Sequence, residues 1–143
     1  MYSPNDTEVH RALEVLTGYA VQLQVALRRC IRSYAMASAG ETPSLEPRDL
    51  RRQLGRLREL MFQAHPAGSD ILRRFENWRE DVDVASVQRD FLVLRASRGV
   101  AHGPSLFELT RATVQLERDT ARIKTWEDAL SLALLPKTAG TAG

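Results

Sequence analysis

The chain has 143 residues, of which 43% are hydrophobic and 27% are charged, as in an ordinary globular domain. Its net charge of +2 is too small to predict nucleic-acid binding by itself, and its single cysteine, Cys30, excludes an internal disulfide. It has neither an apolar run long enough to span a membrane nor a first segment typical of a signal peptide, so we expect a cytoplasmic protein with no membrane partner.

The first predicted helix begins at Pro4, a residue favoured at the first helical position, and ends before Gly40 and Pro43. Within it, apolar residues repeat at alternating spacings of four and three, which is the pattern of a heptad seam. The seam consists of Val9, Leu13, Leu16, Ala20, Leu23, Leu27, Cys30 and Tyr34.

The second predicted helix runs from about residue 45 to 64 and stops at the His65-Pro66-Ala67-Gly68 segment. A third, short helix follows after Ser69 or Asp70. We expect a break near residues 81–83, because acidic residues are unfavourable in the last turn of a helix. A fourth helix would then bury one apolar side, made of Val84, Val87, Phe91 and Leu94.

The last long helix has a specific start signal, because Ser105 and Glu108 have the spacing of a capping box. Its own heptad seam is interrupted by Asp119, and a bend near Thr125 is a further expectation. A buried carboxylate is costly unless it is paired. Asp119 is therefore either a structural partner of Gln115, Arg122 or an arginine of a neighbouring helix, or a functional acid.

Together these patterns predict an all-α fold, an up-and-down bundle of about five helices with long first and last helices. Residues 3–135 would form one helical-bundle domain, and residues 136–143 a flexible C-terminal tail.

The best functional signal is the arginine content of the second helix and of the region before it. Of the 20 basic residues only Lys124 and Lys137 are lysines, and arginine favours bidentate contacts to phosphate or carboxylate. We name the predicted nucleic-acid-binding set the arginine face: Arg28, Arg29, Arg32, Arg48, Arg51, Arg52, Arg56 and Arg58. It would hold a nucleic-acid backbone, RNA in preference to DNA, or an acidic protein. The alternatives are that these arginines form a solvated helix face or salt bridges inside the fold, and that their number reflects a GC-rich genome.

A second candidate surface lies on the first helix. Val21, Val25 and Met36 fall opposite its seam, which predicts either burial in the same chain or contact with a homo- or hetero-oligomeric partner.

A third candidate is the segment from Arg95 to His102, with six residues between the two. It resembles the Arg-x(4–6)-His signature of HEPN-domain ribonucleases, although Ala96 stands where that family usually has a polar residue. The resemblance implies metal-independent RNA cleavage, with His102 as acid and base and Arg95 stabilising phosphate charge. The alternative is an ordinary helix end.

The leading functional hypothesis is a non-enzymatic helical subunit of a larger assembly that uses the arginine face. In size, helicity and basic surface the chain is similar to the small helical subunits of CRISPR effector complexes. A HEPN-like ribonuclease or toxin and a pure protein-interaction module are the alternatives. We expect no cofactor and no metal site, because His10, His65 and His102 lack partners at metal-ligand spacing.

Overall fold

A computed structural model describes residues 4–39, 49–98 and 103–135, and throughout these ranges the chain is helical apart from short turns. It contains four helices: α1 (Pro4–Ala39), α2 (Leu50–Ala64), α3 (Asp70–Ser97) and α4 (Leu106–Leu134). The all-α prediction is confirmed, whereas the count of five helices is wrong by one. The predicted C-terminal tail, residues 136–143, lies outside the described residues.

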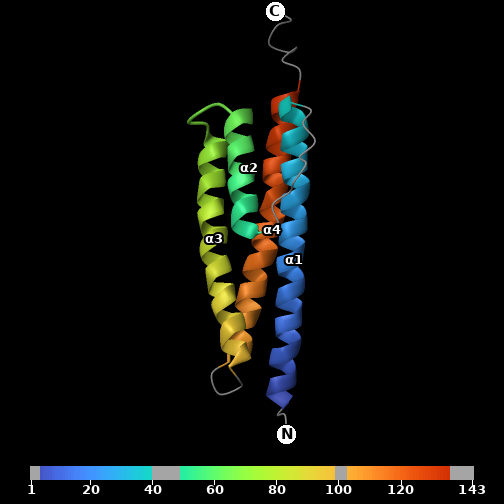
Figure 1. Cartoon of the computed structure of the whole chain (residues 1–143), viewed down its shortest axis with the longest axis vertical. Coiled ribbons are helices and arrows are strands. Elements are labelled where there is room, and N and C mark those ends of the chain that lie inside the picture. The colour runs from blue at the N-terminus through green and yellow to red at the C-terminus, as the bar shows by residue number, and fades with distance from the viewer. Residues whose placement is uncertain (1–3, 40–48, 99–102, 136–143) are drawn as a thin grey trace, which may run out of the picture.

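The directions of the helices differ from those of an up-and-down bundle. Figure 1 shows α1, α2 and α4 running the same way, with only α3 running opposite to them. Contacts agree with this arrangement: Ser38, near the end of α1, donates a hydrogen bond to Gln63, near the end of α2. The predicted up-and-down order is therefore wrong for the first pair of helices, which are parallel.

The predicted seams of α1 and α4 form the centre of the core. Leu23, Leu27 and Cys30 of α1 are fully buried, as are Leu116 and Ile123 of α4. Burial raises the pKa of the Cys30 thiol to about 12, so this cysteine stays a neutral core residue.

An aromatic cluster joins α3 and α4 in the half of the molecule that contains α2. Phe75, Trp78 and Trp126 have ring centroids 5.5 to 5.8 Å apart. The Tyr34 hydroxyl of α1 donates to the Trp126 carbonyl oxygen at 2.7 Å and lies 2.8 Å from Nε2 of His65. These contacts tie three helices and the α2–α3 turn together. Gly68 in that turn has φ +75°, a conformation that favours glycine.

The predicted break at residues 81–83 is wrong, because α3 continues through them to Ser97. The acidic residues there lie in mid-helix, and Asp83 pairs with Arg51 of α2 at 3.5 Å. α4 is likewise one continuous helix to Leu134, so no separate helix begins near Thr125. The capping box at its start is confirmed, with Ser105 and Glu108 making both hydrogen bonds.

The inward side of the C-terminal half of α3 also differs from the prediction. The four residues expected to be buried are 47% to 64% exposed, namely Val84, Val87, Phe91 and Leu94. The residues that point inward are instead Val82, Ala85 and Arg89. α2 offers no cover here, since its first turn is level with Asp83 and Figure 1 shows it beside only one half of α3.

Candidate functional site

Half of the arginine face is engaged in ion pairs within the chain. Four of its members each pair with a carboxylate: Arg29 with Glu127, Arg51 with Asp83, Arg56 with Glu59, and Arg58 with Glu76. The acidic stretch of α3 is therefore the neighbour of the basic side of α2, which accounts for the uneven charge along the sequence.

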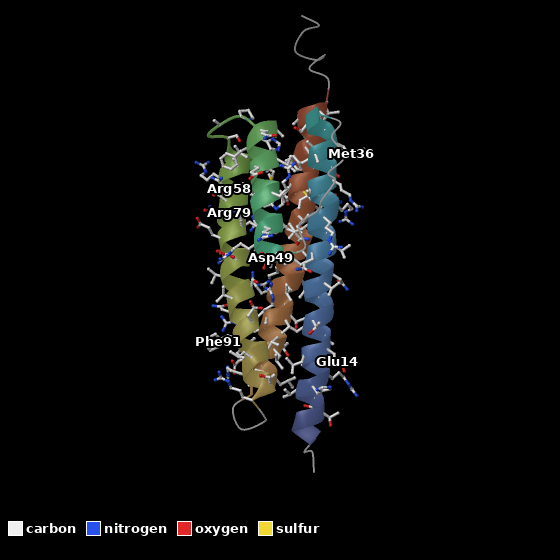
Figure 2. All side chains as sticks on the ribbon, viewed as in Figure 1. Glu14, Met36, Asp49, Arg58, Arg79 and Phe91 are labelled. Atoms are coloured by element: carbon white, nitrogen blue, oxygen red, sulfur yellow. The ribbon has the colours of Figure 1, made fainter. Side chains whose placement is uncertain are left out.

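The Arg58–Glu76 contact is the closest of these pairs. Arg58 Nε lies 2.8 Å from Glu76 Oε1, and the same carboxylate accepts two hydrogen bonds from Arg79. Partial burial opposes ionisation of Glu76, but the hydrogen bonds and charges of Arg79 and Arg58 outweigh it and lower its pKa. The Arg58 guanidinium also stacks on the Phe62 ring at 4.5 Å. Figure 2 shows Arg58 and Arg79 at neighbouring levels of α2 and α3.

The remaining arginines of the set differ in their surroundings. Within the described ranges, Arg28 and Arg52 have no carboxylate partner, and Arg52 is exposed. Arg32 has an interaction of its own. Arg48 lies outside the described residues. Arg28 and Arg52 are thus the members best placed to meet an external anion.

Arg95, from the HEPN-like segment, has a structural role. Its Nη1 donates to Glu108 Oε2 at 2.7 Å, and its Nη2 donates to the Gly103 carbonyl oxygen at 3.2 Å. The hydrogen bond from Arg95, with that from the Ser105 backbone, lowers the pKa of Glu108. Arg95 thereby fixes the end of α3 to the capping box of α4. His102 lies outside the described residues, so the two are not placed relative to each other.

Asp119 is buried, with 3% of its surface exposed. Gln115 donates to its Oδ1 at 2.9 Å, while Oδ2 has no hydrogen bond. Burial raises the pKa of the Asp119 carboxyl, and the charge of Arg89 on α3 acts in the opposite direction. Arg89 is itself only 7% exposed, and burial lowers its pKa. Two opposite charges enclosed between α3 and α4 favour the structural role for Asp119.

The predicted partner contact on α1 is solvent-exposed. Val21, Val25 and Met36 are 54%, 52% and 69% exposed, so they are not buried within the chain. Val21 and Val25 are neighbours on the helix, but Arg28 and Arg32 follow Val25 at helical spacing and separate it from Met36 on that side.

The structure adds a surface made of residues that the periodicity predicts to be buried. Val84, Val87, Phe91 and Leu94 repeat at spacings of three, four and three, and hence form one stripe along α3. We name these four residues the docking stripe. It lies opposite the buried side of α3, and Figure 2 shows Phe91 at the outer edge of that helix.

A groove between α3 and α4 adjoins the docking stripe. It has a volume of about 770 Å³, and Val84 and Phe91 belong to both features. On its α4 side the groove is lined by Glu108, Arg111 and Gln115, so a polar margin follows the apolar stripe. Surfaces of this composition are typical of protein–protein contacts, which have an apolar centre and a polar rim.

In comparisons with known proteins, no family model, curated protein or solved structure matches the chain. Among the described helices, none has an apolar stretch long enough to cross a membrane. The described residues contain no group of three or more histidine, cysteine or acidic side chains that is arranged to hold a metal ion.

Proposed function

We propose that this chain is a non-enzymatic helical subunit of a larger assembly, and that it joins the assembly by docking a helix against α3. The observation that carries the proposal is the exposed docking stripe at heptad spacing on the outer side of that helix. An outer helix face is normally polar, and contiguous exposed apolar residues mark interaction sites.

The outer side of α3 changes character along its length, which further supports docking. Beside α2 it carries Arg73, Asn77 and Glu80, all exposed and polar, as expected of a surface in water. Further along the helix the same side carries the four apolar residues of the docking stripe. The apolar stretch begins level with the first turn of α2 and continues beyond it.

We expect Phe91→Glu to remove the protein from its assembly in the native host. Placing a carboxylate in the centre of an apolar contact leaves a buried unpaired charge, and central aromatic residues dominate binding energy. Wild-type protein should migrate well above its 16.1 kDa monomer mass on native size separation, and the variant should migrate as the monomer. Nuclease treatment should not alter the wild-type size.

The matched control is Phe107→Glu, which makes the same chemical change at an aromatic residue that is 73% exposed on α4 and lies outside the stripe. This control should behave as wild type. An unchanged assembly with Phe91→Glu would refute the proposal, and so would equal loss with both variants.

The arginine face is a second candidate, as a holder of a nucleic-acid backbone, because Arg28 and Arg52 have no carboxylate partner among the described residues. If it binds RNA, affinity should fall at least about tenfold between about 50 and 200 mM salt, since binding releases counterions. Arg28→Glu with Arg52→Glu should abolish binding in a fluorescence anisotropy titration.

The control for this titration is Arg11→Glu with Arg118→Glu, which changes the net charge equally at exposed positions outside the arginine face. It should retain most of the affinity. Absence of RNA binding at low salt, or equal losses in the two double variants, would count against the arginine face.

A further inference from the structure

We propose that the partner helix is α3 of a second copy of this chain, packed antiparallel about a two-fold axis that passes level with Arg89. This inference rests on the proposed function, since it names the occupant of the docking stripe. It predicts an isologous dimer in which the same surface of both copies is used.

The residue positions of the docking stripe are symmetric about residue 89. Val84 and Leu94 each lie five residues from it, and Val87 and Phe91 each lie two residues from it. In an antiparallel pair, Val84 of one copy therefore meets Leu94 of the other, and Val87 meets Phe91. Every layer of the contact joins two apolar side chains of complementary size, a β-branched valine against a larger residue.

Charged residues at both ends of the stripe continue this symmetry. Glu80 and Arg98 each lie nine residues from residue 89, on the same side of the helix as the stripe, and both are exposed. Antiparallel packing brings Glu80 of each copy opposite Arg98 of the other, which gives two attractive pairs at the rim. Parallel packing would instead oppose Glu80 to Glu80 and Arg98 to Arg98. Charge complementarity thus selects a second copy in the antiparallel orientation.

The contact is short, so we expect a weak dimer. The stripe spans about three helical turns, and Asp90, which flanks it, would face Asp90 of the other copy near the axis. We predict a dissociation constant in the micromolar range. Sedimentation velocity of the purified full chain from about 1 to 300 µM should show a monomer–dimer equilibrium.

The charge pairs give a test that an unspecific apolar contact would not pass. Glu80→Arg alone and Arg98→Glu alone should each weaken the dimer about tenfold, because symmetry turns two attractive pairs into two repulsive ones. A chain carrying both substitutions should regain the wild-type affinity. An equimolar mixture of the two single variants should form a heterodimer, and failure of both rescues would overturn the inference.

Disulfide trapping tests the orientation. Val84→Cys and Leu94→Cys proteins, mixed and oxidised, should yield a cross-linked heterodimer, whereas neither should cross-link with itself. Positions 84 of two antiparallel copies lie about ten residues, or 15 Å, apart along the axis. Efficient self-cross-linking of Val84→Cys would show parallel packing and overturn the proposal. The native Cys30 is buried in the core and does not compete.

The outcomes separate this inference from the proposed function. Phe91→Glu should be monomeric in purified form. Its circular dichroism should equal that of wild type, and so should its melting temperature at concentrations where wild type is also monomeric. If purified wild type is a monomer at every concentration tested, the second copy is not the occupant. If Phe91→Glu nevertheless leaves the native assembly, the docking function stands with another protein as partner; if it does not, both proposals fail.

Discussion

Trp126→Ala should reduce the free energy of unfolding by about 4 kcal/mol and the melting temperature by about 10–15 °C. The indole is fully buried at the meeting point of three helices, where it packs against Phe75 and Trp78. Its removal leaves a large cavity that the rigid surroundings fill only in part. The substitution keeps the backbone carbonyl that accepts the Tyr34 hydroxyl, so the loss measures packing. Chemical denaturation at constant m-value tests this expectation.

Two comparisons make the Trp126 prediction specific. Leu132→Ala on the same helix should be nearly neutral, because Leu132 is 69% exposed. Trp126→Phe should cost less than Trp78→Phe: the Trp126 Nε1 has no hydrogen bond, whereas the Trp78 Nε1 donates to the Asp119 carbonyl oxygen at 3.2 Å. A larger loss of stability for Trp126→Phe than for Trp78→Phe would contradict the roles assigned to these two residues of the aromatic cluster.

The parts of the fold that the sequence predicts correctly are those with strong local signals. Heptad seams over seven or more turns determine which sides of α1 and α4 are buried, and the capping box marks the start of α4. The directions of the helices lack such a signal. Whether α2 runs with or against α1 depends on tertiary contacts such as that of Ser38 with Gln63, which no periodicity encodes.

The error at residues 81–83 has an electrostatic origin. Acidic residues are unfavourable in the last turn of a helix, and a cluster of them therefore predicts a break. In the fold, Asp83 is in mid-helix and faces Arg51, a residue more than thirty positions earlier in the chain. A favourable pair between distant segments thus removes the reason for a break, and only the assembled bundle contains that pair.

The periodicity predicts that the docking stripe is buried because the stripe is the more apolar side of the C-terminal half of α3. The periodicity favours the side of Val87 and Phe91, because apolar residues recur there at helical spacing without interruption. The side that is actually buried contains Ala85 and Arg89, a small residue and a cation, and so looks polar in a pattern analysis. Because Arg89 occupies the side that is buried, the sequence pattern favours the opposite side as the buried one. The candidate interaction surface is therefore not evident from the sequence.

The charge of Arg89 on the inward side leads to the second large effect. Arg89→Leu should destabilise the fold by about 3 kcal/mol, because it leaves the Asp119 charge buried without its opposite. Asp119→Leu should cost less, because burial outweighs the attraction of Arg89 in the pKa of Asp119. The double variant should return to within about 1 kcal/mol of wild type, which is a strongly non-additive cycle. Asp128→Leu, an exposed acidic residue of the same helix, should change stability little.

The pH dependence of the folding stability of the same variants shows whether ionisation of Asp119 stabilises or destabilises the fold. Burial raises the pKa of Asp119 above that of the unfolded chain, so the folded state binds its proton more tightly. Ionised Asp119 therefore lowers stability as the pH rises from the unfolded pKa, about 4, through the raised folded value, and the penalty stays constant above it. Denaturation curves between about pH 3 and 8 should show this loss in wild type and not in the double variant.

Arg89 points inward behind the docking stripe, so the double variant should still dimerise, whereas Phe91→Glu should keep its stability and lose association. Stability would then depend on the inward side of α3 and docking on its outer side. Equal loss of dimerisation in the double variant and in Phe91→Glu would contradict this assignment.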